Sequence, residues 1–400
     1  MFGIGIGFFL PSDSQKVVVV LQWLEKFAIN IGRYAVVPVL VFSLTMAVFK
    51  LRQEEQFWPL LLKNILLIIA ASVFVIFSGI LTTLIYSPGR VPIERAEQLA
   101  AIGLNPLGNI IELFPSNMFS VLAGDGVYLF PLCVFAFFLG MGLNYDRNFA
   151  KPVISMVDSL SRVFYHVGTF FSEILGFIII VLAAYWAFRF RGVWHMKVYK
   201  DLLIMLGVFS VVFCFGILPL FLYLLRGKVN PWRVLYGFLG PAMTAFFSGD
   251  INFTFTILMR HLKENFGIKR RASALSMGLC SSFCRGGSAM VAAAAFIVII
   301  KSYTYLRIAP LDAVSIGLQA FVISFLLARR PGDGAFAALA ALCLSYGGGE
   351  YSAGYLIVQP IAFYLVAVGT FIDVMLSAFC SYIAARTSKL LDGKNIVQFI

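Results

Sequence analysis

The sequence predicts an all-α polytopic membrane protein, and three observations support this fold class. The 400 residues are 60% hydrophobic and only 12% charged, whereas soluble domains carry about 25% charged residues. Several apolar stretches reach the roughly 20 residues that a membrane-spanning helix needs. In the second half of the chain, three consecutive apolar segments are each broken near the middle by a polar sequence that contains glycine. Such a chain has no room for a soluble domain of any size.

The net charge of +12 indicates a membrane rather than a nucleic-acid partner. Basic residues cluster at the ends of the apolar segments, where Lys and Arg set topology and contact lipid headgroups. We therefore expect a multi-pass protein of the cell (inner) membrane, with lipid as a partner and no nucleic acid. The first residues, MFGIGIGFFLP, are apolar but too short to span a bilayer, and no charged segment precedes them. We expect no cleaved signal peptide, and either a short first helix or a chain that starts inside one.

The first half of the chain contains apolar segments of two kinds. Residues 105–143 are interrupted by the sequences NPLGN, FPSN and AGDG, and clusters of Pro, Gly and Asn break helices. A segmented helix is expected there. The other apolar segments predict ordinary spans at residues 34–49, 58–86, part of 151–188, and 202–225.

The second half contains the broken segments. Residues 235–257 are cut by SGDIN, residues 272–300 contain CRGGS, and residues 311–344 are cut by ARRPGDG. A backbone group freed by such a break costs several kcal/mol in hydrocarbon unless it is paired, so breaks occur where they line a protected cavity. Interrupted helices mark the binding site of many secondary transporters. We expect SGD and RPGDG to be the tips of two re-entrant hairpins, CRGGS an unwound helix centre, and residues 355–385 the last span.

Cysteines, histidines and enzyme motifs give no sign of a metal centre or of catalysis. Cys280 and Cys284 are four residues apart on one helix face, which fits either a metal site or small thiols at a helix interface, and we favour the thiols. The three histidines are scattered along the sequence, so no metal cluster is expected. The sequence contains no HExxH motif, no phosphate-binding loop and no nucleophile–His–carboxylate set. We expect neither enzymatic activity nor a cofactor.

Several of these segments together resemble the dicarboxylate/amino acid:cation symporter family, the glutamate-transporter group. GRYAVVPVLVFSL resembles the second helix of that family, and LFPSNMFSVLAGDGVYLF resembles its fourth, including a Pro-Ser-Asn element. NPWRVLYGFLGPAMTAFFSGD resembles the sixth helix running into the first hairpin, and RPGDG stands where the second hairpin carries Pro-Gly-x-Gly. The matches fall in the family's order over nearly the whole chain.

The resemblance implies a glutamate-transporter-like elevator fold, with about eight transmembrane helices and two re-entrant helical hairpins, assembled as a homotrimer. Residues 1–150 would form mainly scaffold and trimerisation helices, residues 151–230 would mix scaffold and transport helices, and residues 231–400 would form the transport core. Within that core we expect hairpin 1 at about 235–262, the broken helix at about 272–302, hairpin 2 at about 311–346 and the last helix at about 355–386.

The family's signature residues are largely replaced. Its seventh helix carries Asn-Met-Asp-Gly-Thr, whose oxygens hold sodium, and this position falls on CRGGS. In the eighth helix, Asp373 matches the aspartate that meets a substrate amine, but Leu376 stands where an arginine binds the substrate carboxylate. Asp250 stands at a serine position of the first hairpin. Because sodium prefers several hard oxygen ligands, we expect no sodium coupling in the family's manner.

Arg285 in CRGGS is the most informative of these replacements. A charge at membrane depth costs at least about 3 kcal/mol and usually faces a cavity with a partner. We favour Arg285 as a tethered cation that replaces the metal ions and clamps a substrate carboxylate. The alternative is a fixed salt bridge from Arg285 to Asp250 or Asp373. The expected substrate-binding residues are Arg285, Asp373, Asp250, Ser248, Asn252, Ser288, Ser377, Gly332 and Asp333.

These observations predict an elevator-type secondary active transporter for a small anionic or zwitterionic solute, such as an amino acid or a dicarboxylate. Two alternatives stay open. The first is an anion-conducting, channel-like protein, because a basic cavity favours anions. The second is a relative that binds a solute or regulates a partner without transporting anything.

Overall fold

The computed structural model describes residues 2–11, 15–92, 106–194, 196–225, 230–304 and 309–392. These residues are almost entirely helical, and the one β-type pairing among them is an isolated antiparallel bridge between Ile268 and Leu391. In the described part, 7 helical stretches are long and apolar enough to cross a membrane. The predicted all-α membrane class is confirmed.

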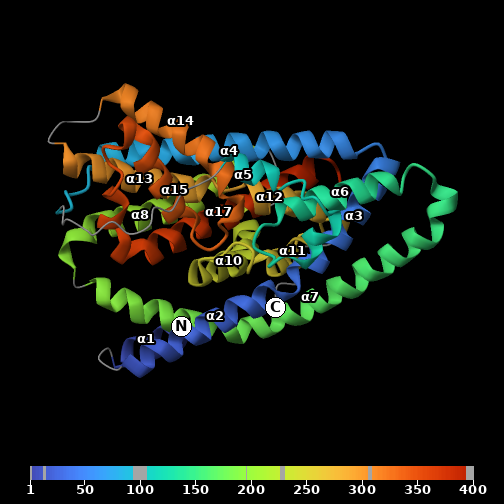
Figure 1. Cartoon of the computed structure of the whole chain (residues 1–400), viewed down its shortest axis with the longest axis horizontal. Helices are drawn as coiled ribbons and strands as arrows, with labels where there is room; N and C mark the ends of the chain where they lie inside the picture. Colours follow the sequence, from blue (N-terminus) through green and yellow to red (C-terminus); the bar gives the residue numbers. More distant parts are fainter. Residues whose placement is uncertain are drawn as a thin grey trace.

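The chain begins with four helices, α1 (Phe2–Phe9), α2 (Gln15–Tyr34), α3 (Val36–Gln53) and α4 (Phe57–Tyr86). α2 and α3 follow each other almost without a break, so Lys16–Gln53 makes one long apolar stretch. The predicted span at residues 34–49 is therefore the second half of a longer element. In Figure 1, α4 runs along one long border of the molecule.

The predicted segmented helix and the spans after it are present. Residues 106–142 form α5 (Pro106–Ile111), the 3₁₀ turn η1 (Met118–Ala123) and α6 (Phe130–Gly142). The next helix, α7 (Arg147–Trp194), has 48 residues and exceeds the predicted span. A short 3₁₀ turn, η2 (Lys197–Tyr199), precedes a segment built from α8 (Lys200–Val212), the π turn η3 (Phe213–Ile217) and α9 (Leu218–Leu224).

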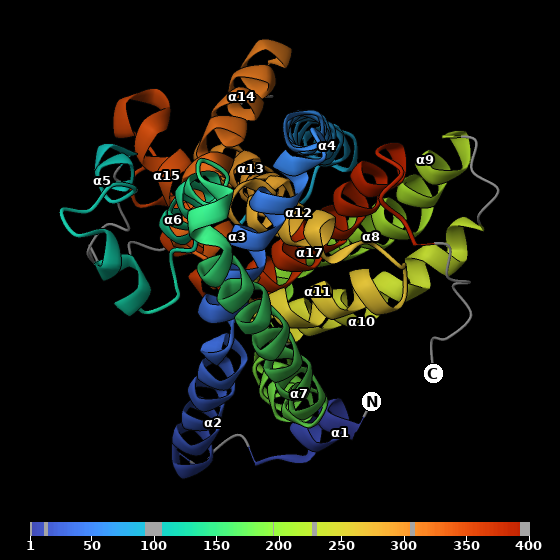
Figure 2. The ribbon, with the colours of Figure 1, turned by 90° about the vertical axis from the view of Figure 1, so that its right-hand side faces the viewer.

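α1 and α2 both pack along α7. Figure 2 shows these three helices as a limb that projects from the main helical bundle, to which α7 is joined by its packing against α3. Close approach is possible because α1 carries glycines at the contact: a Cβ built on Gly3 would lie 2.2 Å from the carbonyl oxygen of Ile180. Small residues of this kind allow membrane helices to pack tightly.

The second half contains both predicted hairpins and the broken helix between them. Hairpin 1 consists of α10 (Pro231–Ser248) and α11 (Phe255–Glu264), and hairpin 2 consists of α14 (Pro310–Leu326), the 3₁₀ turn η4 (Leu327–Arg329) and α15 (Gly334–Ser345). We call residues 249–254 the first tip and residues 330–333 the second tip. The broken helix is α12 (Arg270–Phe283) and α13 (Gly286–Tyr303); the end of the chain forms η5 (Tyr346–Gly349), α16 (Gly354–Ile357), η6 (Gln359–Ile361) and α17 (Ala362–Thr387).

α13 lies at the centre of this half. Every side chain from Gly286 to Ile300 is buried, and α13 packs against α4, α14, α15 and α17. Its alanine-rich sequence fits this position, since small side chains let four neighbours approach one helix. The break between α12 and α13 therefore lies deep inside the packed bundle.

Candidate functional site

The break between α12 and α13 is shorter than the sequence suggested, since only Cys284 and Arg285 leave the helical conformation. Arg285 has φ −113° and ψ 20°, and helix resumes at Gly286. The glycines that follow are required by packing. A Cβ built on Gly286 would lie 2.7 Å from Ser72 Cα on α4, and one on Gly287 would lie 2.6 Å from Ile372 Cβ on α17. The break is thus clamped between α4 and α17.

Arg285 is a fully buried cation without a bonded partner. Its exposed fraction is 0%, and its Nε, Nη1 and Nη2 atoms have no hydrogen-bond partner among the described residues. The carboxylates that attract it most are those of Asp373, Asp250 and Asp333, but none of them bonds to it. The hydroxyl of Ser72, beside Gly286, is also buried without a partner. Buried polar groups are nearly always satisfied in proteins, so this combination makes the break a candidate binding site.

Asp373 on α17 caps the start of α13 instead of pairing with Arg285. Its Oδ1 atom accepts hydrogen bonds from the backbone nitrogens of Gly287 at 2.7 Å and Ser288 at 3.1 Å. Its Oδ2 atom accepts a bond of 2.6 Å from the Ser288 hydroxyl. A carboxylate at a helix N-terminus is stabilised by the free N–H groups and by the helix dipole. Both oxygens of Asp373 are therefore used within the protein.

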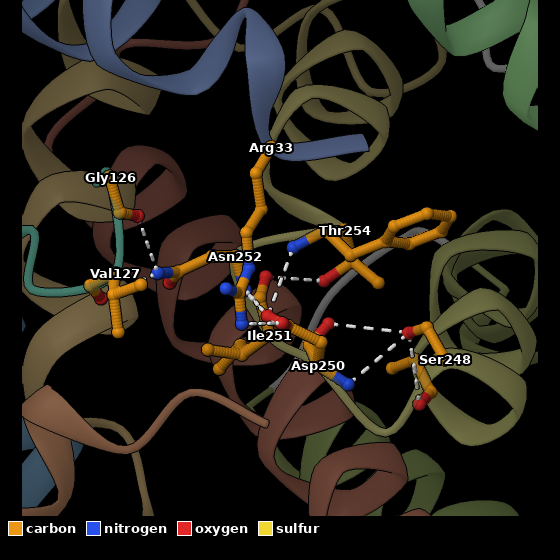
Figure 3. A network of polar contacts seen from close by, with 10 residues as sticks. Arg33, Gly126, Val127, Ser248, Asp250, Ile251, Asn252 and Thr254 are labelled. Carbon is orange, nitrogen blue, oxygen red and sulfur yellow. Dashed lines mark hydrogen bonds and ion pairs between the residues drawn. The ribbon is translucent and has the colours of Figure 1, made fainter. Parts of the chain in front are cut away.

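The first tip is a turn built around a second carboxylate (Figure 3). Oδ1 of Asp250 accepts hydrogen bonds from the backbone nitrogens of Asn252 at 2.8 Å and Phe253 at 3.2 Å. Before it, the hydroxyl of Ser248 accepts a bond of 3.2 Å from the Asp250 nitrogen. Gly249 has φ +64°, a conformation that favours glycine. The SGDIN sequence thus specifies this turn locally.

Two contacts attach the first tip to the N-terminal part of the chain. Arg33, near the end of α2, forms an ion pair with Oδ2 of Asp250 (Figure 3). The side-chain nitrogen of Asn252 donates to the carbonyl oxygens of Gly126 at 3.2 Å and Val127 at 2.8 Å, just before α6. Asp250 and Asn252 are both 1% exposed.

The second tip meets the first. The backbone nitrogen of Ile251 donates a hydrogen bond of 3.3 Å to the carbonyl oxygen of Pro331. Gly332 is exposed, and a Cβ built on it would lie 3.5 Å from Asp250 Oδ2. Asp333 pairs with Arg330 at 3.0 Å.

A cavity of about 720 Å³ opens beside the two tips. It is lined by the second tip, by Arg33, and by residues of the segment from α5 to α6 that include Glu112 and Asp125. Arg285 and Asp373 do not line it. The buried guanidinium of Arg285 therefore does not open into this cavity.

The structure does not support the alternative interpretation of Arg285, a fixed salt bridge. A salt bridge to Asp250 or to Asp373 was considered, and neither exists: Asp250 pairs with Arg33, and Asp373 bonds to α13. The hydroxyl of Ser377, another expected site residue, donates to the carbonyl oxygen of Asp373 one turn earlier in α17 at 2.7 Å. Its side chain is engaged with its own helix.

Arg33 is the residue that sequence reasoning missed. The signal was present, because Arg33 interrupts the apolar stretch Lys16–Gln53 in the same way that Arg285 interrupts its own segment. A charge inside a span usually has a partner or a function. Nothing in the sequence pairs Arg33 with Asp250, which lies 217 positions away.

The profile of the sodium:dicarboxylate symporter family matches residues 1–387. The chain belongs to the sodium:dicarboxylate symporter family. Comparison with curated proteins gives no match. Membership of a symporter family indicates a transporter, and with the apolar helices it establishes a multi-pass membrane protein. The resemblance drawn from the sequence is confirmed.

This sodium:dicarboxylate symporter family member carries unusual residues at the centre of its fold. Arg285, Ser288 and Asp373 meet at the break in the middle of the bundle, while Ser248, Asp250 and Asn252 build the first tip. Gly332 and Asp333 belong to the second tip. Eight of the nine expected residues thus fall into three neighbouring groups, and the ninth, Ser377, lies one turn after Asp373 on α17.

Proposed function

We propose that this protein transports a small organic anion with at least one carboxylate, such as a dicarboxylate, and that Arg285 binds the carboxylate. The observation that carries the proposal is the guanidinium of Arg285, which is fully buried and has no hydrogen-bond partner in the part of the chain that the structure describes. A guanidinium offers five N–H donors in a planar arrangement that matches a carboxylate. An arriving anion would supply the charge and the acceptors that Arg285 lacks.

The hydrogen bonds already made by Asp373 favour a substrate anion without an ammonium group. An amine-bearing substrate needs a free carboxylate, yet both oxygens of Asp373 already accept bonds from Gly287 and Ser288. The other buried carboxylate, Asp250, pairs with Arg33. A dicarboxylate needs neither of them, whereas an amino acid would have to displace an existing partner.

We further propose that transport does not use sodium in the family's usual manner. Sodium would lie beside a buried positive charge, and repulsion between like charges is strong where water is excluded. The residues at the family's seventh-helix motif, Cys284, Arg285 and Gly286, contribute no side-chain oxygen. A tethered guanidinium would supply the positive charge instead.

The elevator mechanism, the homotrimer and the division into scaffold and transport core belong to this proposal as well. The small side chains of α13 support a core that moves as one body, because its helices contact one another closely. In a trimer, the limb formed by α1, α2 and α7 would face the other copies. Cross-linking of the purified protein in membranes tests the trimer.

The experiment is succinate uptake into proteoliposomes, with the sodium gradient present or replaced by choline. We expect uptake that is independent of sodium. Arg285→Gln should reduce uptake at least about thirtyfold, because a buried charged contact is worth roughly 2–5 kcal/mol. Arg162→Gln is the matched control: Arg162 is an exposed arginine on α7 that pairs with Asp158 at 2.9 Å and does not line the cavity beside the tips, so its loss should leave uptake unchanged.

Three results would contradict the proposal. Uptake that requires sodium would refute the role of Arg285 as a substitute cation. Uptake that persists in Arg285→Gln would remove Arg285 from the binding site. Succinate-independent anion current without accumulation would identify a channel instead.

A further inference from the structure

Arg33 lines the cavity beside the tips while its counterion lies behind it. Arg33 belongs to the cavity wall, and Asp250 does not. The side chain of Arg33 is 21% exposed, and that of Asp250 only 1%. The pair therefore presents its positive member to the cavity and its negative member to the protein interior.

The other arginines of the same cavity are arranged differently. Arg329 pairs with Glu112, and Arg330 pairs with Asp333. All four of these residues line the cavity, so each positive charge is neutralised by a carboxylate that faces the same space. Asp125 adds a further negative charge to the wall. Arg33 is thus the cation of this wall whose carboxylate partner is turned away from the cavity.

Arg33 also retains unused hydrogen-bonding capacity. Its Nε atom is buried and has no partner among the described residues. Its Nη2 atom lies close to the second tip, since a Cβ built on Gly332 would be 3.6 Å from it. An anion that reaches the tips from the cavity would meet this guanidinium first.

Asp250 connects Arg33 to Arg285. Asp250 pairs with Arg33 and is also one of the carboxylates that attract Arg285. One carboxylate therefore pairs with a guanidinium at the cavity and also attracts a guanidinium in the core. When a substrate carboxylate replaces Asp250 on Arg33, the released carboxylate keeps its attraction to Arg285.

We propose that Arg33 is a second substrate-binding residue, which takes the anion from the cavity by exchange with Asp250 before the anion reaches Arg285. The inference rests on the proposed function, because it requires an anionic substrate that Arg285 binds. It assigns Asp250 the role of a competitor for Arg33 rather than that of a substrate ligand.

If Arg33 and Asp250 have these roles, substitutions of the two residues should change the KM for succinate in opposite directions. Arg33→Gln should raise the KM for succinate about tenfold or more, the usual effect of losing a charge-assisted hydrogen bond. Asp250→Asn should lower the KM, because it frees Arg33 and keeps the Oδ1 acceptor for Asn252 and Phe253. Arg33→Lys, which preserves the charge, should lie between Arg33→Gln and the unaltered protein. Arg162→Gln, which lies outside the cavity, should leave the KM unchanged.

If the Arg33–Asp250 pair only holds α2 against the first tip, the variants should show another pattern of KM and maximal rate. Arg33→Gln and Asp250→Asn would then shift KM and maximal rate in the same direction, and the reversed pair, Arg33→Asp with Asp250→Arg, would restore both. That result would overturn the inference and leave the proposed function intact, provided Arg285→Gln still abolishes uptake.

Succinate binding to the purified protein, measured by calorimetry, extends the comparison to variants that bind but do not transport. Absence of both binding and uptake in the unaltered protein would overturn both proposals.

Discussion

Asp373 and Ser288 are joined twice across the interface of α17 and α13. The Ser288 hydroxyl donates to Oδ2 at 2.6 Å, and the Ser288 nitrogen donates to Oδ1 at 3.1 Å. A helix cap usually comes from the residue just before the helix, but here it comes from a helix 85 positions later in the sequence. The capping bond therefore also fixes the two helices relative to each other.

Removing this cap should destabilise the protein. Asp373→Ala leaves two buried backbone N–H groups and the Ser288 hydroxyl without an acceptor, and each unsatisfied group costs about 1–3 kcal/mol. Thermal unfolding in detergent should show a clear loss of stability, and Asp373→Asn, which keeps one acceptor oxygen, should show a smaller one. If Asp373→Asn instead abolished amino-acid binding at unchanged stability, Asp373 would be a substrate ligand and not a cap.

Replacing Arg285 by an apolar residue of similar length should stabilise the empty protein. An unpaired charge in the membrane interior costs at least about 3 kcal/mol, and Arg285→Met removes it while filling much of the same space. We expect a higher unfolding temperature without substrate and no stabilisation by succinate. The unaltered protein should be stabilised by succinate, because a ligand that binds only the folded state raises stability. A lower unfolding temperature for Arg285→Met would mean that the guanidinium holds the structure together.

A methyl group at the start of α13 should disrupt the packed core. In Gly287→Ala the new Cβ would lie 2.6 Å from Ile372 Cβ and 2.8 Å from the Gly369 carbonyl oxygen, so α17 would have to move. We expect a loss of several kcal/mol in stability, as for other overpacked interiors, together with loss of uptake. Gly176→Ala on α7 is the control, because a Cβ there meets nothing within 4 Å. It should be neutral or stabilising by up to about 1 kcal/mol. Equal behaviour of the two variants in thermal unfolding would show that α13 is not closely packed at Gly287.

The helices could be predicted from the sequence because a membrane span is specified by local sequence. Length, apolarity and the positions of Gly and Pro define where a helix begins and breaks in a bilayer. The hairpin at residues 235–262 and the break at CRGGS were placed within a few residues for this reason. α7 exceeded its predicted span because its first turns, which contain Pro152, are polar and carry no membrane signal.

The partners of the charged side chains could not be predicted from the sequence in this way. Asp250 and Asp373 were identified as buried carboxylates, but both were considered as partners of Arg285. Pairing depends on which helices lie side by side, and Arg33 and Asp250 are 217 positions apart. No local pattern distinguishes two arginines that compete for one aspartate.

The sequence by itself determined that this chain crosses the membrane repeatedly, that two hairpins and a broken helix lie in its second half, and that charges stand inside apolar segments. Only the tertiary structure decided which charges neutralise one another. Hydrogen bonds and ion pairs form only over a few ångströms. Asp250 therefore pairs with Arg33, Asp373 caps the start of α13, and Arg285 is left buried without a bonded partner among the described residues.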